Sequence, residues 1–179
     1  MDGTGEDDII EEDERQMIDA VLHLEETRAR DIMVPRVDIV AAEESEETHA
    51  ILRRIIEAGH SRMPIYRDSI DNIVGILYAK DLLPYVVGET EQPKLADLLR
   101  PAHIVPESKR IDDLLTELRR KRVHIAIVVD EYGGTAGLVT IEDILEEIVG
   151  EIQDEYDVEL PLVERLSDRE ILADGRLPL

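Results

Sequence analysis

The sequence predicts an α/β (α+β) fold built from two copies of one β-α-β-β-α unit that pack as a pseudo-twofold pair. The first observation is an internal repeat with a constant offset of 62 residues, which relates four pairs: Asp68 and Asp130, Gly75 and Gly137, Asp81 and Asp143, Leu83 and Leu145. The second is an offset of 66 residues, which places Asp31 and Pro35 against Asp97 and Pro101. The third is size: a unit of roughly 55–60 residues buries little core alone, so we expect the two copies to share one body.

The predicted organisation has four parts: an acidic N-terminal linker and helix (1–27), a first repeat (28–93), a second repeat (94–152), and a linker with the truncated start of a further domain (153–179). The first 14 residues hold eight acids and no base, a composition typical of disorder or of a solvated helix start. Between Arg15 and Leu24 apolar residues recur at helical spacing. This pattern predicts an N-terminal helical linker that leads into the first repeat.

In the first repeat the sequence predicts a short strand, a helix, two apolar strands joined by a turn, and a second helix. The short strand falls within DIMVPRVDIV (31–40), and the first helix ends near AGHSRM (58–63). The paired strands lie in PIYRDSIDNIVGILY (64–78), with the turn expected at SIDN (69–72).

The second repeat shows the same order with stronger signals. A short strand is expected in DLLRPAHIV (97–105) and a helix in IDDLLTELRRKR (111–122). Two strands, IAIVV (125–129) and GLVTI (137–141), flank the glycine-containing turn EYGG (131–134). Because both strands are continuously apolar rather than alternating, we expect both of their faces to be covered.

Composition removes several classes of function. The chain has 43 acidic and 20 basic residues and a net charge of −23, which excludes a nucleic acid as a partner bound through its phosphates. It has no cysteine, which excludes disulfides and thiolate chemistry. No apolar run is long enough for a membrane helix, so we expect a soluble, cytoplasmic chain, or the cytoplasmic part of a membrane protein.

Catalytic and metal motifs are weak, and we expect no enzyme and no resident metal. Ser61 follows Gly59 but lacks the second glycine of a nucleophile elbow, and the glycines of 133–137 lack the lysine of a P-loop. The five histidines show no spacing typical of metal ligands. The acidic run 146–159 is typical of a solvated helix rather than of converging Mg²⁺ ligands.

The segment GLVTIED (137–143) allows two interpretations. It ends a strand and begins a helix, so Thr140 can cap that helix while Asp143 complements the helix dipole. Alternatively, the Asp143 carboxylate at the helix start accepts hydrogen bonds from two vicinal hydroxyls of a sugar. The other repeat has Tyr78 and Asp81 at the matching positions, so the aspartate recurs without the capping threonine. Capping alone does not explain that recurrence.

Several longer motifs resemble one family, the tandem cystathionine-β-synthase (CBS) domains of the CorC/HlyC and CNNM magnesium and cobalt transport proteins. The motifs are RDIMVPR, GHSRMPIY, VPESKR, HIAIVVDEYGG and GLVTIEDILEEIVGEIQDEYD, and they cover roughly residues 15 to 160. The tail ILADGRLPL (171–179) is similar to the first strand of the small domain that follows in that family, which indicates a piece of a longer protein. Family members usually carry a transmembrane domain before the acidic linker, although some lack one.

The resemblance implies two βαββα CBS repeats that dimerise into a flat disc and bind ATP or AMP, with Mg²⁺, in a cleft between the repeats. By position, Asp143 would accept from the ribose hydroxyls and Thr140 would contact the ribose or the α-phosphate. The other residues carried over are three for adenine and two for phosphate: Val34, His60 and Ser61, then Arg36 and Arg62. The replacement of threonine by Tyr78 argues against a second site in the first repeat.

Two bland alternatives stay open for this set: Arg62 can pair with one of the many acids, and His60 can be a charge at a helix C-terminus after Gly59. Two function classes also remain. The first is a nucleotide-sensing regulatory module of a Mg²⁺/Co²⁺ transport (efflux) protein, and the second is a dimerisation scaffold with no nucleotide ligand.

Overall fold

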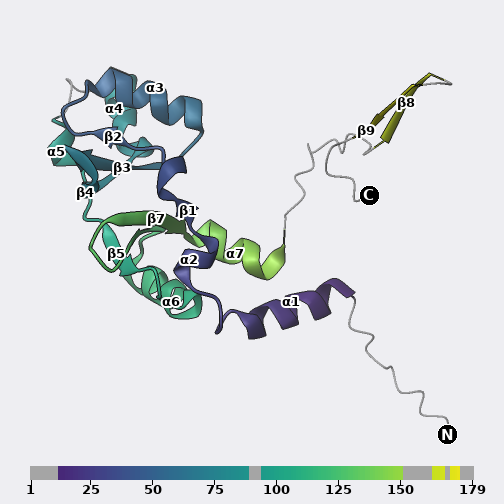
Figure 1. Ribbon diagram of the computed structural model, residues 1–179. Helices are drawn as coiled ribbons and strands as arrows, with labels where there is room; N and C mark the ends of the chain where they lie inside the picture. The colour runs from purple at the N-terminus through teal and green to yellow at the C-terminus, as the bar shows by residue number, and fades with distance from the viewer. Residues whose placement is uncertain (1–11, 89–93, 151–162, 168–169, 174–179) are drawn as a thin grey trace, which may run out of the picture.

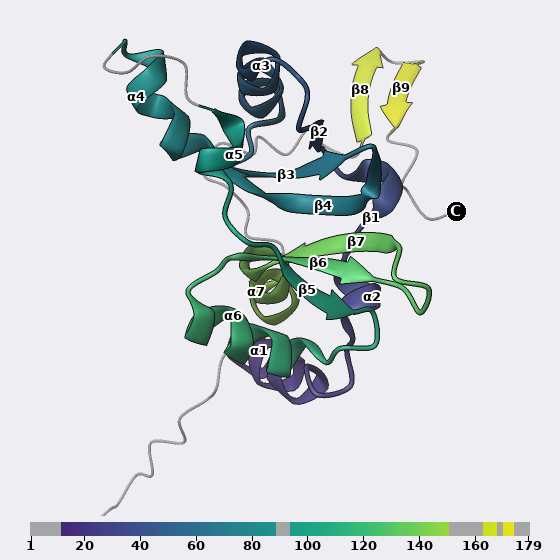
Figure 2. The ribbon, with the colours of Figure 1, turned by 90° about the vertical axis from the view of Figure 1, so that its left-hand side faces the viewer.

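The computed structural model describes residues 12–88, 94–150, 163–167 and 170–173 (Figure 1). Two small halves, one for each repeat, lie against each other, and each is a sheet with helices on its outer side (Figure 2). A 3-stranded sheet in the order β2-β3-β4 belongs to the first repeat, and a 4-stranded sheet in the order β1-β7-β6-β5 belongs mainly to the second. Figure 2 shows these sheets stacked, with their helices on the outer sides. This arrangement confirms the predicted fold class.

The first repeat follows the predicted order. Its elements are α2 (Ala29–Ile32), β1 (Val34–Pro35), the 3-10 turn η1 (Arg36–Asp38), β2 (Ala42–Glu43), α3 (Thr48–Ala58), β3 (Arg62–Arg67), β4 (Ser69–Tyr78), the 3-10 turn η2 (Ala79–Leu82) and α4 (Leu83–Val86). The predicted turn at 69–72 is wrong, because the chain reverses one residue earlier. Asp68 adopts a left-handed conformation with φ 61°, which aspartate tolerates better than most residues, and β4 begins directly after it.

The second repeat matches its predicted segments closely. Its elements are α5 (Leu95–Leu98), β5 (His103–Pro106), α6 (Ile111–Lys121), β6 (Ile125–Val129), β7 (Thr135–Thr140) and α7 (Ile141–Val149). β5 is parallel to β6, and β6 and β7 form an antiparallel hairpin through residues 130–134. Helices α6 and α7 both present buried leucine or isoleucine side chains to this sheet.

Each repeat contributes a short segment near its start to the sheet of the other repeat. Val34 of β1 pairs with Leu138 of β7, and the segment around Arg100 pairs with Ile76 of β4. A glycine makes each approach feasible. A Cβ on Gly137 would lie 2.5 Å from the Val34 carbonyl oxygen, and one on Gly75 would lie 3.0 Å from the Arg100 carbonyl oxygen. The two matching backbone crossings follow the pseudo-twofold relation that the repeats predict.

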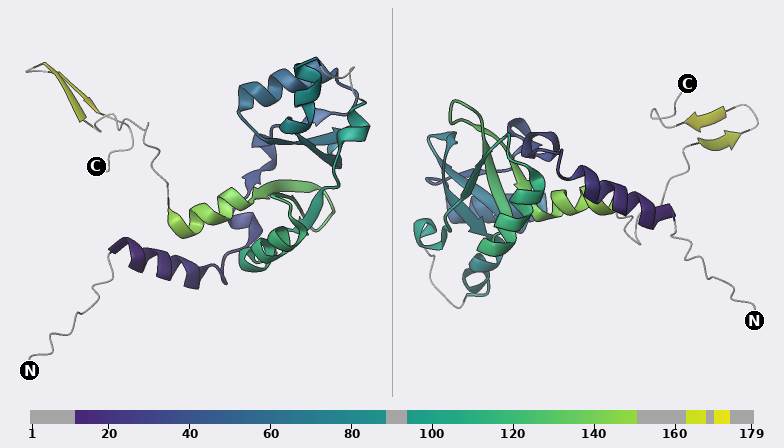
Figure 3. Two further views of the ribbon diagram at one scale, coloured as in Figure 1. Left: turned by 180° about the vertical axis from the view of Figure 1, so that it is seen from behind. Right: turned by 90° about the horizontal axis from the view of Figure 1, so that it is seen from below.

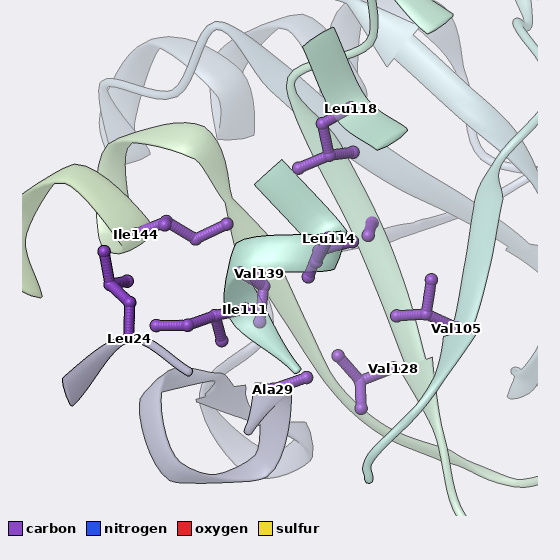
Figure 4. Close-up of a cluster of buried hydrophobic side chains, with 10 residues drawn as sticks. Leu24, Ala29, Val105, Ile111, Leu114, Leu118, Val128, Val139 and Ile144 are labelled. Carbon is purple, nitrogen blue, oxygen red and sulfur yellow. The ribbon is translucent and has the colours of Figure 1, made fainter. Parts of the chain in front are cut away.

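Three buried clusters hold the structure together. One lies within each repeat, and Figure 4 shows that of the second repeat, in which Leu24 faces Ile144. The third lies between the two sheets and joins the repeats: Ile76, Tyr78, Ile125, Ile127 and Leu138. Burial of these apolar side chains at the junction, at about 25 cal/mol per Å², favours a single body over two separate units.

The N-terminal helix α1 (Glu12–His23) begins three residues before the predicted start and packs alongside α7 (Figure 3). At the other end, β8 (Val163–Ser167) and β9 (Glu170–Ala173) form an antiparallel hairpin. The predicted strand in the tail corresponds to β9, and β8 was not predicted. Residues 1–11 and 174–179, and most of the acidic run 146–159, lie outside the described residues.

Candidate functional site

A cavity of about 420 Å³ opens between the repeats, beside the junction of β7 and α7. Six of the seven predicted site residues line it: Val34, His60, Ser61, Arg62, Thr140 and Asp143. The remaining lining residues are Asp38, Val40, Gly59, Ile125, Leu138 and Glu142. The volume falls within the roughly 300–1,000 Å³ range of small-molecule sites, and the apolar walls with a few convergent polar groups are typical of such sites.

Thr140 and Asp143 form a capping box at the start of α7. The Thr140 hydroxyl accepts a hydrogen bond from the Asp143 backbone N–H at 3.2 Å, and the Thr140 backbone N–H donates to Asp143 Oδ2 at 2.6 Å. The structural interpretation of GLVTIED is therefore correct. It does not use the whole carboxylate, since Oδ1 of Asp143 has no hydrogen bond within the described residues. The box holds the carboxylate rigidly at the cavity wall.

Backbone features place the other predicted residues. Val34 reaches the cavity because β1 lies against Gly137 of β7. Gly59 ends α3 in a left-handed conformation with φ 68°, and this turn directs the exposed His60 and Ser61 to the cavity. The interpretation of His60 as a charge near a helix C-terminus is consistent with this position, and it coexists with a place in the cavity wall.

Arg62 lines the cavity and is incompletely paired. Its Nη1 lies 3.5 Å from Oε1 of Glu142, whose side chain is 62% exposed. The buried Nε of Arg62 has no hydrogen-bond partner. The alternative of pairing with an acid is thus present, but this contact with an exposed carboxylate leaves Nε of Arg62 without a partner. A buried donor left without a partner costs about 1–3 kcal/mol, and an anion in the cavity could accept from it.

Arg36 is the predicted residue that does not line the cavity. Both of its Nη atoms donate to the Asp71 carboxylate of β4, and Nη1 also donates to the Thr135 carbonyl of β7 at 2.9 Å. These hydrogen bonds to Arg36, with a further one from the Thr135 backbone N–H, hold the pKa of Asp71 well below its usual range. In this structure Arg36 therefore ties the first repeat to the second and lies outside the cavity, so its predicted phosphate role stays a prediction.

The matching position in the first repeat is built differently. A cavity of about 470 Å³ lies there, related to the first cavity by the pseudo-twofold, and its walls include Tyr78, Arg100 and Arg122. The buried Tyr78 ring stands where the second repeat has Thr140, and the Arg100 guanidinium lies 4.1 Å from the ring centroid. Asp81 pairs with Arg100 at 2.7 Å. Its recurrence in the repeat is thus explained here by an ion pair.

Sequence reasoning missed Asp38, Val40, Glu142 and the two strand residues that form the floor of the cavity, Ile125 and Leu138. Glu142 carried a signal, since it precedes Asp143 in the first turn of α7. The floor residues carried none, because any apolar residue in a covered strand has the same pattern.

Among the described residues no group of three His, Cys, Asp or Glu side chains is placed to hold a metal ion. None of the described helices is long and apolar enough to cross a bilayer.

Comparison with known proteins decides the family. Residues 29–88 and 95–150 each match the CBS domain. The chain belongs to the CBS-domain family. This CBS pair is 49% identical over 156 residues to the magnesium and cobalt efflux protein CorC of Escherichia coli (strain K12), in a match that covers 87% of this chain and 53% of CorC. The chain spans about half the length of the curated relatives it matches.

Solved structures agree with this assignment. The CBS pair is 52% identical to the CBS domain of the bacterial CNNM/CorC family Mg²⁺ transporter in complex with ATP, with a TM-score of 0.73 over 78% of this chain and 99% of that one. It is 34% identical to a CBS-domain pair with bound AMP from Klebsiella pneumoniae, with a TM-score of 0.59 over 69% of this chain and 99% of that one. The predicted resemblance to the CorC and CNNM family is confirmed.

Proposed function

We propose that this CBS pair binds an adenine nucleotide, ATP or AMP, in the cavity between the repeats. The Asp143 carboxylate accepts hydrogen bonds from the ribose hydroxyls, and Thr140 contacts the ribose or the α-phosphate. Val34, His60 and Ser61 line the adenine. When the nucleotide is ATP, Mg²⁺ accompanies its phosphates.

The observation that carries this proposal is the state of Asp143 in the cavity wall. One carboxylate oxygen is held by the Thr140 backbone N–H, and the other has no hydrogen bond within the described residues. A carboxylate fixed by its own helix cap loses little side-chain entropy when a ligand binds, which favours affinity. The bound ATP and AMP of the two similar structures support the same chemistry here.

In the longer protein we propose a regulatory role. CorC relatives are magnesium and cobalt efflux proteins, so the nucleotide-bound CBS pair would bias the conformation of a transport domain in the same polypeptide. Such control requires the two conformations to bind the nucleotide with different affinity. We further propose that the pair acts at the cytoplasmic side of the membrane, as a homodimer, and without catalytic activity of its own.

The test is calorimetric titration of ATP, with and without Mg²⁺, and of AMP into the wild-type chain and two variants of Asp143. Asp143→Ala removes the carboxylate and half of the capping box, and we expect affinity to fall by about ten- to a hundredfold, because a hydrogen bond to a charged group contributes roughly 1.5–3 kcal/mol. Asp143→Asn keeps an oxygen for the Thr140 N–H but loses the charge, so it separates the ligand contact from the cap.

Asp113→Ala is the matched control. Asp113 occupies the third position of α6, as Asp143 does in α7, and it is exposed outside the cavity. We expect this control to bind nucleotide like the wild type. If neither ATP nor AMP binds the wild-type chain, the capping box is the whole role of Asp143 and the chain acts as a scaffold.

A further inference from the structure

The side chain of His103 joins two elements of the second repeat, the start of β5 and the last turns of α6. It is only 10% exposed. The ring lines the cavity of about 470 Å³ beside Tyr78, and it does not line the cavity that contains Asp143. The proposed function therefore gives this largely buried, titratable group no role.

Both ring nitrogens of His103 have charged partners on α6. Nε2 lies 3.2 Å from Oε2 of Glu117, and Nδ1 lies 3.1 Å from Nζ of Lys121. The other oxygen of Glu117, Oε1, accepts a hydrogen bond from Lys109 Nζ at 2.8 Å. The four side chains form a row of alternating partners that ties together β5, α6 and the loop between them.

These contacts define the protonation state of the His103 ring. A lysine ammonium has three donors and no acceptor, so the Nδ1 atom that faces Lys121 must be the one with the lone pair. The ring hydrogen is then on Nε2, which donates it to Glu117. The row of contacts therefore requires a neutral imidazole in the Nε2–H tautomer.

The place of the ring between Glu117 and Lys121 is not the one that helix geometry alone would give. A glutamate and a lysine four residues apart on a helix commonly pair directly. Among the described residues, however, the ion pairs of Glu117 are with Lys109 and His103. The attraction of a cation to the C-terminal end of a helix explains a lysine at position 121, but not its contact with a ring nitrogen.

A second proton on the ring would break this arrangement. It would bind Nδ1 and face the Lys121 ammonium across 3.1 Å. Repulsion between two unit charges about 3 Å apart corresponds to roughly a factor of ten in an equilibrium constant even in water, so Lys121 would leave the ring. Burial, and after it the charge of Lys121, lowers the pKa of His103 from its ordinary value.

The surroundings of the ring offer little negative charge to accommodate that proton. Among the described residues whose charges act on His103, only Glu117 is acidic, and it is shared with Lys109. In β6 the residue paired with His103 is the uncharged Ala126. Besides Lys121, the cavity that the ring lines has one phenol and two guanidinium groups: Tyr78, Arg100 and Arg122. A protonated His103 would therefore lie mainly among cations.

The contact with His103 lies at the end of α6. Lys121 is the last residue of this helix, and Arg122 after it has a left-handed conformation with φ 55°, which residues other than glycine seldom adopt. The turn is closed by the Val123 N–H, which donates to the Leu118 carbonyl at 3.0 Å. Loss of the Lys121 contact would therefore free a turn whose backbone is already in a less favourable conformation.

This turn leads directly to the start of α7. The residue after Val123 is His124, whose carbonyl accepts a hydrogen bond from the Ile141 N–H at 3.0 Å. Ile141 is the first residue of α7 and follows Thr140, which forms the capping box with Asp143. A shift at the end of α6 would thus reach the capping box through one backbone hydrogen bond.

We propose that His103, Glu117 and Lys121 form a proton-sensitive latch that fastens the last turn of α6 to β5 at neutral pH and opens in acid. When the latch opens, Lys121 leaves the ring, and the hydrogen bonds of the Val123 and Ile141 N–H groups weaken. The latch does not depend on nucleotide binding. If the proposed function also holds, the latch makes the Asp143 site sensitive to pH.

The experiment is NMR spectroscopy on the full chain between about pH 8 and about pH 4.5. The chemical shifts of the ring nitrogens report the tautomer and the pKa of His103. Amide hydrogen exchange, referred to the intrinsic rate at each pH, reports the protection of Val123 and Ile141. The wild-type titration needs no substitution, so it tests the latch even where a variant fails to fold.

We expect the Nε2–H tautomer at pH 8 and a pKa of His103 below about 6.5, the ordinary value for histidine. Protection of Val123 should fall about tenfold as pH falls through that pKa, and protection of Ile141 should fall in the same range. Since the folded pKa lies below the unfolded one, the latch stabilises the fold above about pH 6.5, and this contribution is lost as pH falls through the folded pKa.

Two variants and a control separate the latch from a merely buried histidine. His103→Gln can still accept from Lys121 and donate to Glu117, so we expect protection of Val123 to be independent of pH. Lys121→Gln removes the facing charge and should raise the pKa of His103. His49→Gln is the matched control, because His49 is an exposed histidine of α3 whose Nε2 contacts the Tyr85 hydroxyl, and it should leave the behaviour of Val123 as in the wild type.

Several results would overturn the latch. The first is the Nδ1–H tautomer at pH 8, or a His103 pKa at or above about 6.5. The second is a pH-dependent protection of Val123 that persists in His103→Gln. The third is unchanged protection of Val123 or Ile141 across the pKa of His103, which would show that the ring has no hold on the two helix ends.

Discussion

The clefts of the two repeats share one backbone plan and differ in a few side chains. Each has a glycine that admits a crossing segment, at Gly137 and Gly75, and each has an aspartate three residues after the end of its strand. Where the second repeat has Thr140 at that strand end, the first has the ring of Tyr78. Both clefts contain a cavity, but Tyr78 and Arg100 line the one in the first repeat, where Asp81 is paired with Arg100, whereas Thr140 and Asp143 line the one in the second repeat.

This difference shows that one residue at the end of a strand can decide whether a helix begins there and how the following aspartate is held. Thr140 caps α7, which runs for 9 residues and holds Asp143 at its start. Tyr78 supplies no cap, so the chain enters the 3-10 turn η2 instead, and Asp81 pairs with Arg100. The first repeat therefore lacks the capping box that holds Asp143 in the second, and it has the Arg100 guanidinium beside the Tyr78 ring instead.

The largest expected effect concerns the glycines that let the segments cross. In Gly137→Ala the new Cβ would lie 2.5 Å from the Val34 carbonyl oxygen and 2.6 Å from Met33 Sδ, so β1 must move away from β7. We expect a loss of about 3 kcal/mol in the free energy of unfolding, measured by urea denaturation, together with weaker ATP binding because Val34 lines the cavity.

Gly75→Ala is the comparison for that substitution. Its closest contact would be Leu99 Cβ at 2.9 Å, with the Arg100 carbonyl oxygen at 3.0 Å, so smaller shifts relieve the overlap. We expect a loss of about 1 kcal/mol and unchanged ATP affinity. Equal effects of the two substitutions on stability and on ATP binding would show that the clefts do not differ in the way described.

The next effect comes from exchanging the residues that distinguish the clefts. Thr140→Tyr should place an aromatic ring in the cavity beside Asp143 and remove the Thr140 side-chain cap of α7, so we expect ATP affinity to fall about a hundredfold by calorimetry. The reciprocal change, Tyr78→Thr, leaves ATP binding at Asp143 in place and removes the ring beneath Arg100. Retention of full ATP affinity by Thr140→Tyr would mean that the nucleotide does not occupy this cleft.

Much of the fold could be predicted because the repeat signals are local. The strands IAIVV and GLVTI and the helix that begins at Ile111 lie within one or two residues of their predicted positions. Continuous apolar runs and helical spacing depend on neighbours a few residues apart, so one sequence is enough to reveal them. The six predicted residues that line the cavity were chosen from the family resemblance rather than from local patterns. Their roles in binding stay predictions.

The parts that could not be predicted depend on contacts between distant segments. The pairing of Val34 with Leu138 joins residues more than 100 positions apart, and no local pattern announces it. The same holds for Arg36, to which the family resemblance assigns a phosphate, because its hydrogen bonds to Asp71 join residues 35 positions apart. The turn was predicted at 69–72, but the left-handed residue is Asp68, and aspartate, like asparagine, tolerates that conformation, so the polar residues here do not fix the turn position.

The smallest expected effect concerns the Arg36–Asp71 ion pair, which joins the first repeat to the second at one end of the junction only. The Arg36–Asp71 pair has no counterpart across the pseudo-twofold, where Ala102 and Gly133 stand at the matching positions. Hydrogen bonds from Arg36 hold the pKa of Asp71 in the folded protein below that of an unfolded aspartate, which is near 3.9. The pair therefore stabilises the fold above about pH 4, and the contribution is lost as pH falls through the lower folded pKa.

Asp71→Asn should lower the urea midpoint slightly and by a constant amount between pH 8 and pH 5, and the difference from the wild type should shrink below about pH 4. Glu44→Gln is the matched control, because Glu44 pairs with Arg67 in an exposed ion pair that stays within the first repeat. Its carboxyl pKa is also lowered, by the hydrogen bond from Arg67, so its pH dependence should be similar. Only Asp71→Asn should in addition loosen the junction, seen as faster amide hydrogen exchange at Thr135, whose N–H donates to Asp71. Equal exchange at Thr135 in both variants would mean that the Arg36–Asp71 pair does not contribute to holding the repeats together.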